Sequence, residues 1–262
     1  MSLKIECPAT RGHVPIASPE RQPLDHLRFS LLFAKKDEGF MLEASKVERV
    51  LVLLAGKCDV EAGDSTFSNL GRKGVFEEKA TAVYVPVGSS CSVVARTETE
   101  VAIISSDAEV THRPQLIPKR NINVRRVGRL NWYREVHDIV TPAVKAQRLL
   151  VGETYNPSGN WSSYPPHRHG RDAPPAESRQ EELYHFRLDP ASGFGLQRIY
   201  TDDHTIDETI VVKDRDTVVI PGGYHPVVAA PGYRLYYLWA LAGESRNLIP
   251  YDDPQHSWVG RL

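Results

Sequence analysis

The chain contains 262 residues, of which 41% are hydrophobic and 25% charged, as in a globular protein large enough for two modest domains. Its formal net charge is −1, so we expect no nucleic-acid partner and no binding to an anionic membrane, because both need a concentrated basic surface. The sequence predicts neither a membrane span nor a signal peptide. Three cysteines, Cys7, Cys58 and Cys91, show no CxxC spacing, which favours reduced thiols and a cytoplasmic location.

The first half of the chain predicts a series of short β-strands. Residues 1–30 are rich in proline and are expected to wrap the first domain as extended segments. Gly56 is expected to end one strand, and Gly63-Asp64 to form the turn of the following hairpin. The predicted strands of this half are residues 27–34, 40–42, 47–54, 75–76, 82–85, 91–95 and 101–105.

The second half begins after a connector and predicts a second series of strands. Residues 107–131 are polar and basic and contain two prolines, which suits a connector. An amphipathic pattern over residues 133–146, interrupted by Pro142, predicts one short helix. The predicted strands of this half are residues 147–153, 183–188, 195–200, 209–212, 217–220, 227–229 and 235–241.

Many short strands with Gly and Pro turns predict an all-β fold of the sandwich or jelly-roll type. The two halves share a layout, because Val85-Pro86-Val87-Gly88 falls late in the first as Ile220-Pro221-Gly222-Gly223 does in the second. We therefore predict two similar β-barrels. Residues 1–115 form the first, without metal, and residues 116–262 form the connector and the second, with the metal site. Exposed edge strands also favour pairing between subunits in a homo-oligomer.

The second half contains a constellation typical of a metal site. His167 and His169 are two positions apart, so on a strand both imidazoles leave the same face. Such a pair alone is also common on protein surfaces. A carboxylate from Glu181-Glu182 on the next strand, and His225 after a Pro-Gly-Gly turn, would complete three nitrogen ligands and one oxygen. Nitrogen-rich ligation suits zinc, while manganese or iron would also fit this mixed set.

This pattern resembles the cupin superfamily, in which paired histidines and a glutamate precede a Pro-x-Gly motif with a further histidine. More specifically, four stretches resemble the bacterial 5-deoxy-glucuronate isomerase family of inositol catabolism. The related 4-deoxy-5-threo-hexosulose-uronate ketol-isomerases of pectin degradation have a similar site. The likeness covers nearly the whole chain and is densest over residues 155–237. The four stretches are residues 165–169, 181–184, 195–203 and 221–233.

The resemblance implies a bicupin, with His167, His169, Glu182 and His225 as metal ligands. Glu182 is preferred to Glu181 because it stands where the family ligand precedes the aromatic strand. Period-2 alternation then points Glu181 away from the metal, where we expect a solvated or salt-bridging group. The long segment 170–180 is expected to form a loop over the mouth of the pocket.

The resemblance also implies an aldose–ketose isomerisation of 5-deoxy-glucuronate to 5-dehydro-2-deoxy-gluconate. A metal that polarises the carbonyl and the adjacent hydroxyl makes the intervening C–H acidic, and a base moves that proton by way of an enediol. The sequence leaves the base open among four side chains: Tyr184, Tyr200, Asp202 and Asp203. Tyrosines on a barrel strand often only pack, and an aspartate at a strand end often forms an Asx turn.

A uronate substrate also needs a cation for its carboxylate. Arg168 and Arg198 are the predicted partners, because guanidinium binds carboxylate through two parallel hydrogen bonds, although both arginines could equally lie on the surface. Tyr237 is predicted to contribute to an aromatic wall of the substrate pocket.

Three other functions use the same features. The pectin-pathway isomerase differs in its uronate, a cupin dioxygenase would use the same ligands with iron and oxygen, and a sugar-binding bicupin would need no catalytic metal. An assay with both uronates distinguishes the two isomerases, and an anaerobic assay distinguishes an isomerase from a dioxygenase. A sugar-binding bicupin would leave the complete set of metal ligands unexplained.

Overall fold

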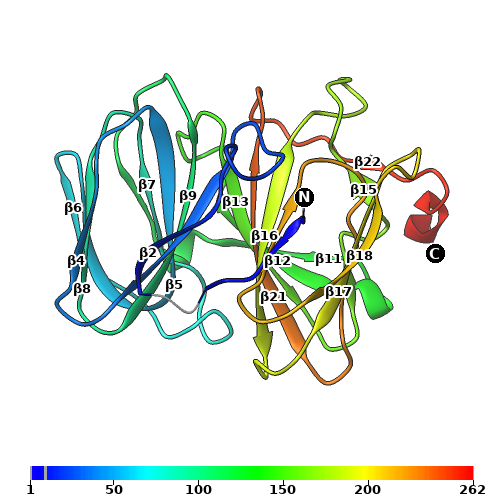
Figure 1. Cartoon of the computed structure of the whole chain (residues 1–262), viewed down its shortest axis with the longest axis horizontal. Coiled ribbons are helices and arrows are strands. Elements are labelled where there is room, and N and C mark those ends of the chain that lie inside the picture. The colour runs from blue at the N-terminus through cyan, green and yellow to red at the C-terminus, as the bar shows by residue number, and fades with distance from the viewer. Residues whose placement is uncertain (1, 9–10, 262) are drawn as a thin grey trace.

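The computed structural model describes residues 2–8 and 11–261. It consists of two β-sheet halves that lie side by side (Figure 1), and every pairing between its strands is antiparallel. The all-β prediction is therefore confirmed, and the two halves are compatible with the two expected barrels. Among the described residues, no helix has the length and apolar character needed to cross a bilayer.

The first half, called the first barrel below, is built on a nine-stranded sheet. Its main path has the order β10-β7-β5-β9-β3-β2, with β4, β6 and β8 attached to one side through β5. Its strands are β2 (Gly12–Ala17), β3 (Arg28–Ala34), β4 (Gly39–Leu42), β5 (Val47–Ala62), β6 (Ser65–Arg72), β7 (Ala82–Val85), β8 (Cys91–Ala95), β9 (Thr99–Asp107) and β10 (Gln115–Ile117).

The second half, called the second barrel, contains three sheets. The largest has the order β1-β19-β16-β21-β13-β12-β11, a second has the order β14-β20-β17-β18, and β15 pairs with β22. Its strands are β1 (Lys4–Ile5), β11 (Asn123–Val127), β12 (Arg134–Val140), β13 (Leu150–Asn156), β14 (Trp161–Ser162), β15 (His167–Arg168), β16 (Glu181–Asp189), β17 (Gly195–Tyr200), β18 (Asp207–Val212), β19 (Thr217–Ile220), β20 (Val227–Ala229), β21 (Arg234–Ala242) and β22 (Tyr251–Asp252). Three short 3₁₀ helices complete the chain: η1 (Lys119–Asn121), η2 (Leu130–Trp132) and η3 (Ser257–Arg261).

Strand pairing crosses the division proposed at residue 115. β1, near the start of the chain, pairs with β19 through Lys4 and Val218, so it extends the sheet of the second barrel. β10 pairs with β7, so the sheet of the first barrel continues to Ile117. The second barrel therefore includes β1 from the N-terminal segment, and the first barrel includes β10, which extends past residue 115. The expectation that residues 1–30 wrap the first barrel is corrected for β1.

Three local predictions were wrong. Residues 75–76 lie in a turn between β6 and β7 and not in a strand. The helix predicted over residues 133–146 is the strand β12, whose β-branched residues Val136, Ile139 and Val140 suit a strand that pairs on both sides. Gly56 does not end a strand, because it lies inside β5, which is 16 residues long. Gly56 has a φ of +94°, and a side chain there would meet the backbone of Glu98, so only glycine fits the bend that carries β5 from one part of the sheet to the other.

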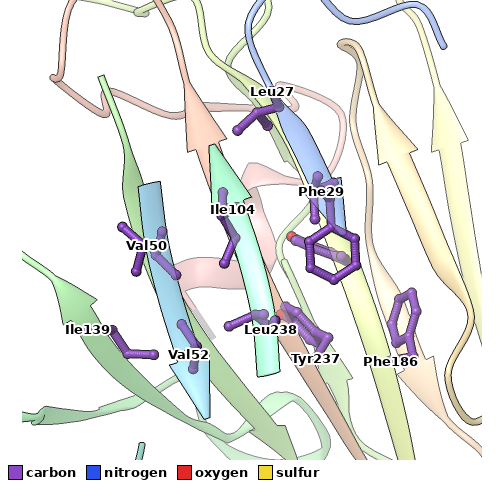
Figure 2. Packing of buried hydrophobic residues seen from close by; sticks show 14 of the residues in the cluster. Leu27, Phe29, Val50, Val52, Ile104, Ile139, Phe186, Tyr237 and Leu238 are labelled. Carbon is purple, nitrogen blue, oxygen red and sulfur yellow. The ribbon is translucent and has the colours of Figure 1, made fainter. Parts of the chain in front are cut away.

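The large sheets of the two barrels pack face to face. Alternate residues of β5 point to opposite sides. Val50 and Val52 join a buried cluster that also contains Ile104 of the first barrel and Leu238 of the second (Figure 2). Leu51 and Leu53 point the other way, into an aliphatic cluster that fills the first barrel. The core between the barrels is thus continuous with that of the second barrel, and the first barrel has a separate hydrophobic core.

Two buried glutamates tie the barrels together. Glu48 of the first barrel accepts hydrogen bonds from the backbone N–H groups of residues 147, 148 and 149, at 2.7, 2.7 and 3.0 Å. Glu181 of the second barrel accepts from those of residues 25, 26 and 27, the first two at 2.6 and 2.7 Å. The expectation of a solvated or salt-bridging Glu181 is corrected, because its carboxylate replaces water with three backbone donors.

A buried ion pair adds to this interface. Arg72 of the first barrel donates from Nη1 and Nη2 to the carboxylate of Glu153 on β13, at 2.6 and 3.0 Å, and both side chains are fully buried. The hydroxyl of Tyr236 donates to the same carboxylate at 2.7 Å. Burial alone would lower the pKa of Arg72, but the charge of Glu153 raises it, so the guanidinium stays charged.

We predict that Arg72→Met lowers the free energy of unfolding by about 3–5 kcal/mol, because the carboxylate of Glu153 would stay buried without its cation. Arg125→Met is the matched control, since Arg125 is 52% exposed in its pair with Asp138. Loss of such a surface pair changes stability by about 1 kcal/mol or less. Urea denaturation of both variants measures the difference, and equal effects would contradict the role given to the buried pair.

Candidate metal centre

Four side chains from three parts of the second barrel converge on one point. β15 presents His167, and His169 follows two positions later on the same side. β16 begins with Glu181 and Glu182, which point to opposite faces of the sheet, so that Glu182 enters the barrel while Glu181 contacts the first barrel. His225 follows β19 after the Pro221-Gly222-Gly223 turn. Gly223 has a φ of +88°, and a side chain there would lie 2.7 Å from the carbonyl oxygen of Tyr200.

The geometry of this group is that of a ligand set. One ring nitrogen from each of His167, His169 and His225 lies within 4.8 Å of the other two. Glu182 Oε2 lies 3.2 Å from His169 Nε2 and 3.3 Å from His225 Nε2. Three imidazole nitrogens and one carboxylate oxygen at these separations can share a single cation.

Backbone carbonyls orient two of the rings. His169 Nδ1 lies 2.8 Å from the oxygen of Gln180, and His225 Nδ1 lies 2.9 Å from the oxygen of Gly223. Because a carbonyl only accepts, each Nδ1 carries a hydrogen, and each Nε2 faces the shared centre. This arrangement is the usual support of metal-binding histidines.

Burial and charge set the protonation of the group. Burial lowers the pKa of His167 and that of His225 to about 3 each, so both rings are neutral at pH 7, as metal ligands must be. Burial would also lower the pKa of His169, but the hydrogen bond and charge of Glu182 raise it. The proton that Glu182 stabilises on His169 is the one that a bound cation would displace.

One atom of the group shows that a cation fits. His225 Nε2 is buried and has no hydrogen-bond partner, because its approach to Glu182 lacks hydrogen-bond geometry. An unsatisfied buried polar atom costs about 1–3 kcal/mol, and a metal ion satisfies it. The residues present therefore fit a divalent cation.

Two tyrosines line the barrel beside this centre. The Tyr184 ring lies 6.0 Å from the His225 ring and 4.2 Å from the Tyr237 ring, measured between centroids. The Tyr184 hydroxyl lies 2.8 Å from Ser163 Oγ, and the Tyr237 hydroxyl contacts Ser162 Oγ. Burial and the charge of Glu182 raise the pKa of Tyr184 well above its usual value, so its hydroxyl keeps its proton at neutral pH.

Arg168 and Asp202 face away from the metal centre and form an ion pair with each other. Arg168 donates from Nε to both oxygens of Glu177, at 3.3 and 3.2 Å, and from Nη1 to Asp202 and to the hydroxyl of Tyr224. Glu177 in turn accepts from the backbone N–H of Gly170 at 2.7 Å. Alternation along the chain explains this orientation, because Arg168 lies between His167 and His169. Its guanidinium organises the 170–180 segment and is already paired.

The other predicted residues also lie away from the four ligands. The Tyr200 hydroxyl donates to Asp253 at 2.6 Å. Asp203 accepts from Thr201 and Thr205 in a turn on the surface, which is the Asx arrangement considered above. Arg198 pairs with Asp207 at 2.8 Å on the outer face of the β17–β18 hairpin. Of the four candidates for the base, the structure brings Tyr184 alone to the metal centre.

Two further residues near the centre carried no sequence signal. Arg134 on β12 is buried and donates to the carbonyl oxygen of Tyr164, three residues before His167. Asp252 on β22 is the direct partner of His167 in the β15–β22 pairing, so its side chain leaves the same face. Arg134 lay in a segment predicted as a helix, and Asp252 lay beyond the dense part of the resemblance.

Among its described residues, the first barrel has no cluster equivalent to the metal centre. Arg49 pairs with Val85 at the point where Glu182 pairs with Ile220, so Arg49 occupies the position of Glu182. Its guanidinium donates to the carbonyl oxygens of Glu43 and Ser89. The position five residues after Val85, which corresponds to His225, is a serine. A fixed cation thus stands where the second barrel has a ligand, which supports a first barrel without metal.

The described residues form two antiparallel β units, one of which holds a cluster of three histidines and a glutamate, and they define an all-β protein with a candidate metal site. Solved structures show the same fold at low identity. An oxalate decarboxylase from Lactobacillus farciminis is 12% identical, with a TM-score of 0.71 over 100% of this chain and 91% of that one. Its alignment covers both barrels.

The chain belongs to the KduI/IolB family, whose model matches residues 5–259. It is 41% identical over 254 residues to a 5-deoxy-glucuronate isomerase of Geobacillus kaustophilus, covering 96% of this chain and 92% of that one. It is 40% identical over 239 residues to the enzyme of that name from Bacillus subtilis strain 168, covering 90% and 88%. A solved IolB-like protein from Salmonella typhimurium is 35% identical, with a TM-score of 0.96 over 99% and 100% of the two chains.

We predict that His167→Ala combined with His169→Ala lowers zinc or manganese affinity by more than about 100-fold, because even loss of a group that only orients a ligand costs 10–100-fold. His204→Ala is the matched control, since His204 is exposed and lies outside the group. Elemental analysis after dialysis and circular dichroism measure metal content and fold. Full metal retention by the double variant would contradict the site.

Proposed function

We propose that this protein is a metal-dependent aldose–ketose isomerase that converts 5-deoxy-glucuronate to 5-dehydro-2-deoxy-gluconate. The convergence of His167, His169, Glu182 and His225 in the second barrel carries the proposal. Relatives named 5-deoxy-glucuronate isomerase, about 40% identical over 90–96% of the chain, supply the substrate. Zinc suits the nitrogen-rich ligands, and manganese or iron would also accept them.

A bound divalent cation supplies Lewis-acid polarisation of the substrate carbonyl and the neighbouring hydroxyl. The chain itself holds the substrate and moves one proton between adjacent carbons. Asp252 is placed to accept that proton, because it leaves the same face of the β15–β22 ladder as His167. It has no hydrogen bond or ion pair with any side chain in the described part of the chain, so its carboxylate is available.

Tyr184 has a different role in this proposal. Its hydroxyl keeps its proton, so it donates a hydrogen bond to a substrate oxygen that gains negative charge during the reaction. Ser163, at 2.8 Å, holds the phenol oxygen in place. The two groups thus divide the chemistry, with Asp252 accepting the proton and Tyr184 stabilising the enediolate.

We expect Asp252→Asn to lower kcat by about 10²–10⁴-fold, the usual worth of a general base, while metal content stays at the wild-type level. We expect Tyr184→Phe to lower kcat by about 10²–10³-fold, because it removes one hydrogen-bond donor to developing charge. Steady-state kinetics and elemental analysis check both variants. A larger loss in Tyr184→Phe than in Asp252→Asn would reverse the two roles.

The function itself is tested by NMR on purified, metal-loaded protein with 5-deoxy-glucuronate, under air and under anaerobic conditions. We expect the ketose product in both, at a rate that exceeds turnover of the pectin-pathway uronate. A requirement for oxygen would point to a dioxygenase, preference for the other uronate would identify the related isomerase, and binding without turnover would leave a sugar-binding protein.

A further inference from the structure

Arg134 is a buried cation without a carboxylate partner. It is 8% exposed, and it forms no ion pair in the described part of the chain. Its two hydrogen bonds both come from Nη1, to the carbonyl oxygens of Trp132 at 3.2 Å and Tyr164 at 3.0 Å. Burial of an unpaired charge is costly, and buried charges in proteins are normally paired. Arg134 is therefore a candidate to pair with an anionic ligand.

The side chain of Arg134 projects into the second barrel, beside the metal centre. Val136 faces Thr154, which faces Tyr237 across the sheet, and Arg134 shares the face of Val136 because the two lie two positions apart. The bond to Tyr164 places the guanidinium beside the segment that leads into His167. Its charge acts on the rings of His167, Tyr184 and Tyr237, so it lies within electrostatic reach of all three.

The local backbone leaves room for this guanidinium. Gly128, in the turn between β11 and β12, has a φ of +77°. A side chain there would lie 3.0 Å from Arg134 Nη1 and 2.2 Å from the carbonyl oxygen of Trp132. A glycine at this turn therefore leaves the space that the guanidinium of Arg134 occupies. Since Nη1 is anchored, Nε and Nη2 form the free edge, which is the edge that carboxylates bind through two parallel hydrogen bonds.

We propose that Arg134 binds the carboxylate of the uronate substrate through the edge formed by Nε and Nη2. The inference deepens the proposed isomerase function and depends on it for the identity of the substrate. It places the carbonyl end of the open chain at the four ligands and the carboxylate end at β12. The predicted carboxylate partners are less suited, because Arg168 is paired with Glu177 and Asp202, and Arg198 with Asp207.

The test uses Arg134→Met and Arg134→Lys in the metal-loaded full chain. Binding of D-glucuronate and of D-glucose is measured by calorimetry, so that the role of the carboxylate is observed whether or not turnover occurs. We expect wild type to bind glucuronate more tightly than glucose, and Arg134→Met to lose on the order of 100-fold in glucuronate affinity and with it this preference. Arg134→Lys should keep part of the preference, because it retains the charge but not the planar fork.

Two controls separate this role from a structural one. Arg125→Met, on the neighbouring strand, should bind glucuronate as wild type does. Arg134→Met should keep its metal, and its melting temperature should not fall, because the substitution removes an unpaired buried charge. A structural arginine would instead lower the melting temperature and leave the preference for glucuronate in the folded fraction.

The outcomes also separate this inference from the proposed function. Unchanged glucuronate affinity in Arg134→Met would overturn the role of Arg134 while leaving the isomerase proposal intact. The same holds if the single variant Arg198→Met loses about 100-fold in glucuronate affinity and Arg134→Met does not. Loss of binding in Arg134→Met, together with no turnover of 5-deoxy-glucuronate by wild type, would support the carboxylate site and reject the isomerase.

Discussion

Two adjacent glutamates at the start of β16 connect the architecture of this protein to its candidate chemistry. Alternation along the strand sends Glu181 to the interface, where three backbone N–H groups of the first barrel hold it, and Glu182 into the second barrel. The position of the metal centre relative to the first barrel is therefore set by a single strand register. A slip of one residue would exchange the two carboxylates and abolish both arrangements.

The same register recurs in the first barrel with a different outcome. Glu48 repeats the role of Glu181, because it holds the backbone of residues 147–149 as Glu181 holds that of residues 25–27. The next residue, however, is Arg49 in place of Glu182, and its guanidinium contacts backbone carbonyls where the second barrel gathers ligands. The two barrels thus share the carboxylate that joins them and differ in the residue that faces inward. This difference explains why one of them is suited to bind a metal and the other is filled with aliphatic side chains.

Buried arginines serve both the scaffold and the candidate site. Arg72 at the interface is matched by Glu153, and the pair is satisfied within the chain. Arg49 in the first barrel is buried without a carboxylate and donates from both terminal nitrogens to backbone carbonyls. Arg134 is anchored through Nη1 alone, and its position beside the metal centre, rather than its lack of a carboxylate, is what supports a ligand carboxylate there.

The sequence by itself determined the all-β class and the resemblance to the 5-deoxy-glucuronate isomerase family. It also predicted the candidate metal ligands, because His-x-His, Glu182 and the Pro-Gly-Gly turn before His225 are local patterns with a fixed geometric meaning on strands. It could not place Arg134, since the periodicity of residues 133–146 suited a helix and only pairing with β11 and β13 made that segment a strand. It could not show that Glu181 is an interface group, that Arg198 is paired outward, or that Asp252 faces the side of His167. Each of these depends on segments far apart in the chain, and long-range strand pairing, which local propensity does not encode, decided them.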